Sequence, residues 1–458
     1  MDFSPAILGA AVAGTVVIAI LFLVGMMKKW GMLIPSIGMM LFGAMALPLT
    51  WNDRVKPTIW LPIQSNRSTL FLGFGCLGML MLLFQLRRLR GKVIPLSALA
   101  LFLAGLYAST LRVVHNDPLD AAQSIFLSIM TLIPLLFTAS AVLDSFDDLR
   151  VLIRGIAVLG MIWLGMTGLQ ILINPTLVTM GNEFRFVGLF SNPQHSGVFM
   201  AFMCVSLLWL VMNDLKRYKL IYLGMLGISG VLLLWTGSRT GLGMAIIGVS
   251  TTLYSRVGRA ILFLPIAGLV GYIGLKIMVD VLGITFGVER LASTANTRDY
   301  AWWKLYTVAM ENPLFGVGTE DAEKSENSWL YGFASYGIGM FALLLSLAIA
   351  GTVEIFRSFR TRFTVTGEYR NYFDFLNGMM LMYFAGAVLE GYMISRVSST
   401  LGFFMIAAVA NANLRKLAKH GWVDEYDEYD EYDEYDEYDD DYVSYSDYGD
   451  DEYAPEQA

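Results

Sequence analysis

The sequence predicts an all-α polytopic membrane protein with about 12–13 transmembrane helices, a long extracytoplasmic loop containing an interfacial helix, and a disordered acidic cytoplasmic tail. Apolar side chains account for 56% of the 458 residues and charged side chains for only 16%, which excludes an ordinary water-soluble domain. Apolar stretches long enough to cross a hydrocarbon layer of about 30 Å recur along nearly the whole chain. We therefore expect a membrane domain over residues 1–422 and a tail over 423–458.

The expected spans are bounded by charged residues, Pro or Asn. They lie approximately at residues 6–26, 32–49, 69–86, 93–111, 123–143, 153–173, 195–213, 219–235, 241–254, 260–279, 329–353, 375–394 and 398–413. The first lacks a basic start and a small-residue cleavage site, so we expect it to remain as a helix. Cys76 and Cys204 both lie inside spans, where we expect packing residues and not a disulfide framework or a metal site.

Orientation follows from the loops in which Lys and Arg collect, because short cytoplasmic loops retain positive charge. One set of alternate loops contains Lys28 and Lys29, the runs 87–92 and 216–219, Arg150 and Arg154, Arg256 and Arg259, the arginines of 357–370, Arg415, Lys416 and Lys419. The N-terminus then lies outside and the C-terminus inside. The outer face receives the long connections 50–68, 174–194 and 280–328, where we expect the functional residues.

The tail explains the net charge of −7, since residues 423–458 contain 18 Asp and Glu and no Lys or Arg. Without it, 32 basic residues face 21 acidic ones, a net charge of +11. Its Asp-Glu-Tyr repeat has no aliphatic side chain to bury, which predicts disorder. We expect either a solvated cytoplasmic extension or a docking segment for a basic partner.

A first polar constellation, RFVGLFSNPQHSG at 185–197, precedes the seventh span. Asn192 and Pro193 predict a turn that caps a helix, with Gln194 and His195 in its first residues. Arg185 and these polar groups could hold an anion. Alternatively, Arg185 reaches lipid phosphates and the rest is a capped helix start.

The second constellation is TGSRTG at 236–241, between two apolar segments joined by only a few residues. Arg239 is therefore expected near membrane depth, where an arginine is costly without a partner or a function. Its planar fork of donors matches phosphate oxygens, and the flanking glycines let backbone N–H groups approach a bound group closely. The alternative is an arginine that extends to the outer surface.

The third stretch is the outer connection, within residues 294–340. Trp302, Leu305, Tyr306 and Ala309 recur at helical spacing and predict an interfacial helix that stops at Asn312 and Pro313. Arg298 lies at its beginning. A helix flat on the bilayer would hold that guanidinium at the level of lipid-linked phosphates.

Glu326 and Asn327 stand just before the eleventh span. The carboxylate at this membrane boundary could act as a base, or the pair could simply cap a helix. A further alternative is a divalent cation held by hard carboxylate ligands, for which the candidates are Glu320, Asp321, Glu323 and Glu326.

In order and type, these elements resemble the O-antigen ligase and polysaccharide polymerase family of bacterial inner-membrane proteins, over roughly residues 185–340. The matching positions are Arg185, Gly188, Asn192 and Pro193, then Ser238 to Gly241, Arg298, the Asn-Pro-Leu-Phe-Gly-x-Gly run 312–318, and Glu326 with Asn327. The family has a His-Asn pair at the last position. Glu326 replaces that His, which favours a polymerase over a ligase.

The resemblance implies a glycosyltransferase of the inner membrane, with its site on the extracytoplasmic side. The donor would be an undecaprenyl-diphosphate-linked glycan and the acceptor a glycan hydroxyl, with inversion and with no metal or other cofactor. Glu326 would be the catalytic base, Arg185, Arg239 and Arg298 would bind the diphosphate, and Asn327, Gln194 and His195 would orient sugars. Membrane lipids, and polysaccharide-assembly proteins reached through the tail, are expected partners, and nucleic acid is not.

Three other functions are compatible with a polytopic chain. One is an O-antigen ligase proper, which attaches glycan to lipid A core. The second is a lipid-linked-glycan flippase or transporter, which typically places ionisable groups near the bilayer midplane; Lys276 and Glu390 are instead expected near the outer ends of their spans. The third is a scaffold whose tail recruits cytoplasmic partners.

Overall fold

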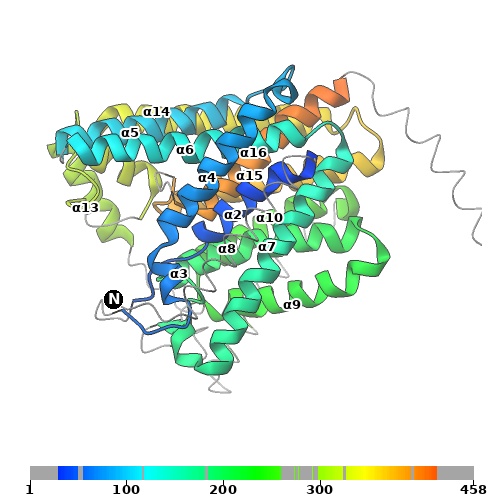
Figure 1. Cartoon of the computed structure of the whole chain (residues 1–458), viewed down its shortest axis with the longest axis horizontal. Helices are drawn as coiled ribbons and strands as arrows, with labels where there is room; N and C mark the ends of the chain where they lie inside the picture. Colours follow the sequence, from blue (N-terminus) through cyan, green and yellow to red (C-terminus); the bar gives the residue numbers. More distant parts are fainter. Residues whose placement is uncertain are drawn as a thin grey trace, which may run out of the picture.

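The structure is a computed structural model that describes residues 29–49, 55–115, 118–180, 184–258, 298–322, 326–393 and 397–419, with the single positions Ile273, Ile277 and Leu291. The expected first span, the expected span 260–279 with Lys276, Glu323 and the acidic tail lie outside these residues or almost wholly so. Figure 1 shows long helices packed side by side in a bundle. The coarse prediction, an all-α fold with many long helices, is therefore confirmed.

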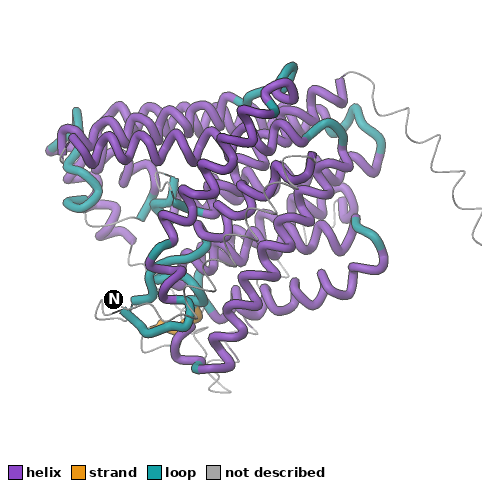
Figure 2. Tube along the Cα trace, viewed as in Figure 1, coloured by secondary structure: helices purple, strands orange, loops and turns teal. Residues whose placement is uncertain are grey.

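Eight helices are long and apolar enough to cross a membrane. They are α4 (Arg67–Phe84), α5 (Leu96–His115), α6 (Pro118–Val142), α7 (Phe146–Ile173), α8 (Pro193–Asn213), α9 (Lys219–Trp235), α14 (Ser328–Thr361) and α15 (Gly367–Leu389). The expected spans 241–254 and 398–413 are the helices α10 (Arg239–Val257) and α16 (Ser399–Lys419), which are long but less apolar. The shorter helices are α2 (Leu33–Gly43), α3 (Leu61–Ser65) and α13 (Arg298–Glu311), and β1 (Thr179–Met180) and β2 (Arg185–Phe186) form a small hairpin, drawn in orange in Figure 2.

The prediction of a full span over 32–49 is wrong. Helix α2 has only 11 residues, about 16 Å of helix, and residues 45–48 continue without helical structure. Backbone carbonyl groups just after the end of α2 accept hydrogen bonds from side chains. Trp163 Nε1 donates to the Ala44 carbonyl at 2.8 Å, and the Arg67 guanidinium donates to the Met45 carbonyl. Irregular backbone at membrane depth is stable only when it is satisfied in this way.

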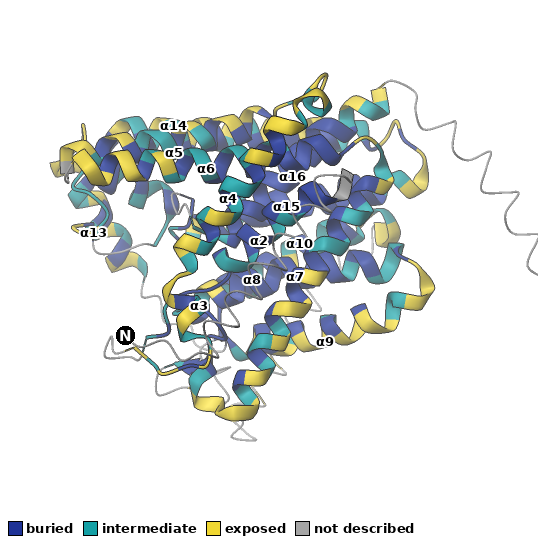
Figure 3. Ribbon diagram, in the orientation of Figure 1, coloured by how far each residue is buried: buried dark blue, intermediate teal, exposed yellow. Residues whose placement is uncertain are grey.

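The core lies where α8, α10, α15 and α16 meet, and Figure 3 shows the buried residues concentrated there. Stacked rings join these helices, with Phe202 and Phe403 at 4.8 Å and Tyr383 and Phe404 at 4.2 Å between centroids. Helix α9 lies at the edge of the bundle and exposes apolar side chains such as Leu220 and Val231. This is the pattern expected of a helix that faces lipid.

Helices α8 and α10 approach most closely through glycine. A Cβ built on Gly241 would lie 2.6 Å from the Gly197 carbonyl carbon and oxygen. The first turns of the two helices therefore touch backbone to backbone, which brings the predicted stretches 185–197 and 236–241 together.

This contact predicts opposite effects for two alanine substitutions in one helix. We expect Gly241→Ala to lower the free energy of unfolding by about 1–3 kcal/mol, because the backbone of α8 must move. Gly243→Ala, whose Cβ would meet nothing within 4 Å, is the matched control and should gain up to about 1 kcal/mol of helix propensity. Thermal unfolding in detergent measures both, and equal midpoints for the two variants would contradict the close approach.

Candidate functional site

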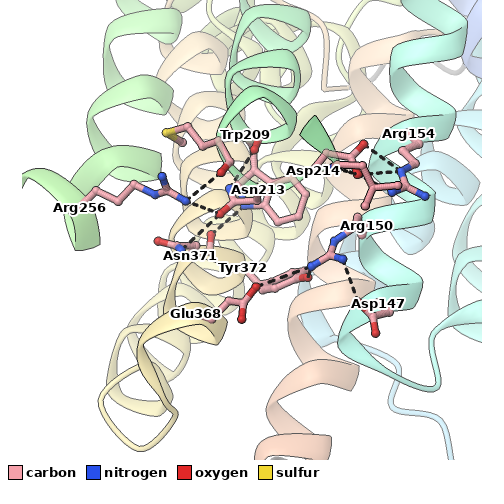
Figure 4. Close-up of polar contacts among 12 residues, drawn as sticks. Asp147, Arg150, Arg154, Trp209, Asn213, Asp214, Arg256, Glu368, Asn371 and Tyr372 are labelled. Atoms are coloured by element: carbon pink, nitrogen blue, oxygen red, sulfur yellow. Dashed lines mark hydrogen bonds and ion pairs between the residues drawn. The ribbon is translucent and has the colours of Figure 1, made fainter. Parts of the chain in front are cut away.

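The loops with the basic residues meet at one end of the bundle, toward the right in Figure 1. Figure 4 shows part of their polar contacts. Arg154 forms an ion pair with Asp214, which also accepts a hydrogen bond from the Tyr222 hydroxyl at 2.8 Å. Arg256 donates to the Asn213 side chain at 2.7 Å. The described basic loops thus lie at one end of the bundle.

Arg298 is the centre of a polar cluster at the opposite end. It is the first residue of α13, and its Nη2 donates to Thr240 Oγ1 at 2.9 Å and to Glu390 Oε1 at 3.0 Å. Its Nε lies 3.9 Å from Glu326 Oε2. One guanidinium therefore joins the start of α10, the end of α15 and the segment before α14.

Glu390 is the most buried carboxylate in this cluster, with a side chain 4% exposed. It lies just after α15 and accepts a further hydrogen bond from Thr240 Oγ1 at 2.8 Å, while its carbonyl accepts one from Ser328 Oγ at 2.6 Å. Burial raises the pKa of Glu390 to about 7, against the hydrogen bond from Thr240 and the charge of Arg298. Burial therefore disfavours the charged form of Glu390 more than its partners favour it.

Glu326 and Asn327 have different environments. Glu326 Oε2 is buried and accepts no hydrogen bond from the residues that the structure describes, so no described donor occupies its lone pairs. Asn327 caps α14, and its side-chain oxygen accepts from the backbone N–H groups of Trp329 and Leu330, both at 3.1 Å. The capping interpretation of Asn327 is thus confirmed, and only its NH2 group remains to orient a sugar.

Arg185 contacts the turn that carries Arg239. Arg185 is buried in β2, and its Nε donates to the Thr236 carbonyl at 2.8 Å. The turn is closed by Ser238, whose side chain caps α10 by accepting from the Gly241 N–H at 3.1 Å. Arg239 is the first residue of α10 and is half-buried. Two of the three predicted diphosphate-binding arginines are therefore connected through one turn.

Gln194 and His195 lie in the first turn of α8. The expected cap is confirmed, since Asn192 is the N-cap, its side chain accepts from the Gln194 N–H at 2.8 Å, and Pro193 is the first helical residue. The His195 ring packs edge-on against Phe190 at 6.5 Å. The link of Gln194 and His195 to the cluster is the close approach of α8 to α10 at Gly197 and Gly241.

The run 312–318 forms hydrogen bonds with backbone groups of α14 where that helix is interrupted. Gly337 has φ 73° inside that helix, and the freed backbone pairs with the incoming loop: Ile338 N–H donates to the Pro313 carbonyl at 2.8 Å and Val317 N–H to the Ala334 carbonyl at 2.9 Å. Gly316 fits here because it has φ 70° and its Cβ would lie 2.4 Å from the backbone of Ser335. These bonds hold the run against α14 and so position the chain that leads to Glu326.

The helix predicted over this stretch is present as α13 and ends at Glu311, before Asn312. Leu305 and Ala309 are buried toward α14 as one stripe, but Tyr306 is exposed beside that stripe and packs with Trp303, at 5.8 Å between ring centroids. The exposed aromatic face is suited to a headgroup layer. The predicted stripe was therefore divided between two faces.

The described acidic residues of the run 320–326 do not converge on one point. Glu320 and Asp321 line a small cavity with Arg112, and Glu326 faces Arg298 instead. Among the residues that the structure describes, no three His, Cys, Asp or Glu side chains form a group able to hold a metal ion.

From the sequence, Glu390 is expected only near the outer end of its span and Thr240 only as part of the turn 238–241, and neither is expected to contact Arg298. A carboxylate at the end of an apolar helix is the signal for Glu390, but its partners are 150 and 92 residues away in sequence and have no local signature. In comparisons with known proteins, no protein-family model matches this chain and no curated protein matches it.

Proposed function

We propose that the protein is a membrane glycosyltransferase of the O-antigen polymerase or ligase type. It transfers a glycan from an undecaprenyl-diphosphate donor to a hydroxyl of an acceptor glycan. The observation that carries the proposal is the contact of Arg298 with Glu326, Glu390 and Thr240, at the end of the bundle away from the basic loops. With the cytoplasm at the basic end, the site faces the extracytoplasmic side of the bacterial inner membrane.

In the proposed reaction the acceptor oxygen attacks the anomeric carbon. The bond from that carbon to the diphosphate oxygen breaks, the electron pair leaves with the diphosphate, and the acceptor proton moves to Glu326. The oxygen Oε2 suits this role because it accepts no hydrogen bond from described residues, and a base acts within hydrogen-bond reach of the proton that it takes. Attack opposite the leaving group inverts the anomeric centre.

The arginines stabilise the charge that develops on the leaving diphosphate. Arg239 and Arg298 act on it directly. Arg185 is bonded to the Thr236 carbonyl, so its first effect is to hold the turn from which Arg239 projects. Glu390 keeps Arg298 oriented through the shared bond to Thr240. The proposal assigns charge stabilisation to guanidinium groups and uses no metal ion.

Purified protein with a diphosphate-linked oligosaccharide and an acceptor tests this function. We expect wild-type protein to produce a ladder of longer glycans that persists when a chelator is present. A single addition to lipid A core in place of a ladder would identify a ligase. Product that disappears with chelator would contradict charge stabilisation by arginine alone, and no transfer under either condition would contradict the function.

A further inference from the structure

An apolar groove with a basic end lies far from the proposed active site. It has a volume of about 430 Å³ and runs between the start of α5, the cytoplasm-directed half of α14 and the end of α16. Its walls include Ile94, Leu96, Ile349 and Val353, which are 43%, 65%, 58% and 40% exposed. The groove is thus open at the side of the bundle and presents aliphatic surface to the surroundings.

Two arginines close one end of this groove. Arg357 from α14 and Arg415 from α16 both line it and are near enough to repel each other electrostatically. Neither forms an ion pair with a residue that the structure describes; Arg415 donates only to the Asn411 carbonyl, at 3.3 Å. Two like charges on one cavity favour an anion between them.

The nearby carboxylate, Glu354, does not neutralise both arginines. Glu354 is buried and is held by Ser97, whose backbone N–H donates to Oε1 at 3.2 Å and whose hydroxyl donates to Oε2. It joins α14 to the first turn of α5 and offsets one positive charge. One net positive charge therefore remains at the mouth of an apolar groove.

We infer that this groove binds one anionic phospholipid, with an acyl chain along the aliphatic wall and the headgroup phosphate between Arg357 and Arg415. Guanidinium groups match phosphate oxygens, and basic pockets between membrane helices at the cytoplasmic level suit anionic headgroups. The acidic tail is a weaker occupant, since its Asp-Glu-Tyr repeat supplies charge but no aliphatic chain for the wall. This lipid site is separate from the proposed transfer reaction.

The test uses the full chain in a neutral detergent, titrated with phosphatidylglycerol or with phosphatidylcholine of the same acyl chains, with bound lipid counted by native mass spectrometry. We expect one tightly retained phosphatidylglycerol. The double substitution Arg357→Gln and Arg415→Gln should weaken it about 10- to 30-fold. Arg360→Gln, an exposed arginine of the same helix outside the groove, is the matched control and should leave binding unchanged.

A second variant tests the apolar wall. Val353→Trp fills the groove while both arginines remain, and because Val353 is partly exposed the chain should fold, as its thermal midpoint will show. It should also weaken phosphatidylglycerol at least 10-fold. Equal binding of the two lipids, or full binding by Val353→Trp, would overturn the inference. Stronger lipid binding after removal of residues 423–458 would assign the groove to the tail and overturn it as well.

Discussion

Replacing Glu326 with Gln should reduce glycan transfer about 100- to 10,000-fold, the range that a positioned general base contributes. The amide keeps the size of the side chain but cannot take the acceptor proton. Binding of the donor should change little, because Glu326 lies 3.9 Å from Arg298 and is the weaker of its two carboxylate contacts. Single-turnover transfer and donor binding, measured separately on purified protein, distinguish the two effects.

Glu320→Gln is the matched control for this variant. Glu320 belongs to the same acidic run but lines a separate small cavity beside Arg112, so its substitution should leave the rate within about twofold of wild type. If Glu326→Gln retained full transfer, Glu326 would not be the base. Glu390, whose pKa is about 7, would then be the next carboxylate to test.

Local signals predicted much of this fold correctly. Asn192 before Pro193 predicted the start of α8, and Asn312 with Pro313 predicted the end of α13, because caps and proline act within a few residues. The stretch 32–49 misled, since apolar composition does not distinguish a spanning helix from a short helix followed by packed irregular chain. Part of what ends α2 is local, because Pro48 has no N–H to bond the Ala44 carbonyl. Part is tertiary, since Trp163 and Arg67 bond the carbonyls of Ala44 and Met45.

In the candidate site too, local features were predictable from the sequence and tertiary contacts were not. The arginines were found as charges in places where charge is costly, and that argument needs only the sequence. Which groups they meet depends on the packing of α10, α13 and α15, and so the Thr240–Arg298–Glu390 contact had no local signature. The motif 312–318 carries part of the family resemblance, and in the structure its glycines allow the loop to pair with α14 at the break around Gly337. Its contribution to function is the placement of the next segment.

Replacing Arg298 with Ala should have the second large effect, a loss of about 100- to 1,000-fold in transfer, comparable to the removal of one donor to a developing oxyanion. The same change leaves Glu390 buried without its ionic partner, and removing one member of a buried pair costs about 3–5 kcal/mol of stability. Activity and thermal stability should therefore fall together, as transfer assays and thermal unfolding of the purified variant will show.

A second substitution separates the two consequences. Adding Glu390→Gln to Arg298→Ala removes the unpaired charge but leaves a side chain that Thr240 can still contact, so most of the lost thermal stability should return. Transfer should stay low, because no guanidinium has been restored to the leaving group. Arg256→Ala, an exposed arginine bonded at the opposite end of the bundle, controls for loss of positive charge. If transfer recovered with stability in the double variant, Arg298 would serve only to neutralise Glu390, and stabilisation of the diphosphate would rest on Arg239.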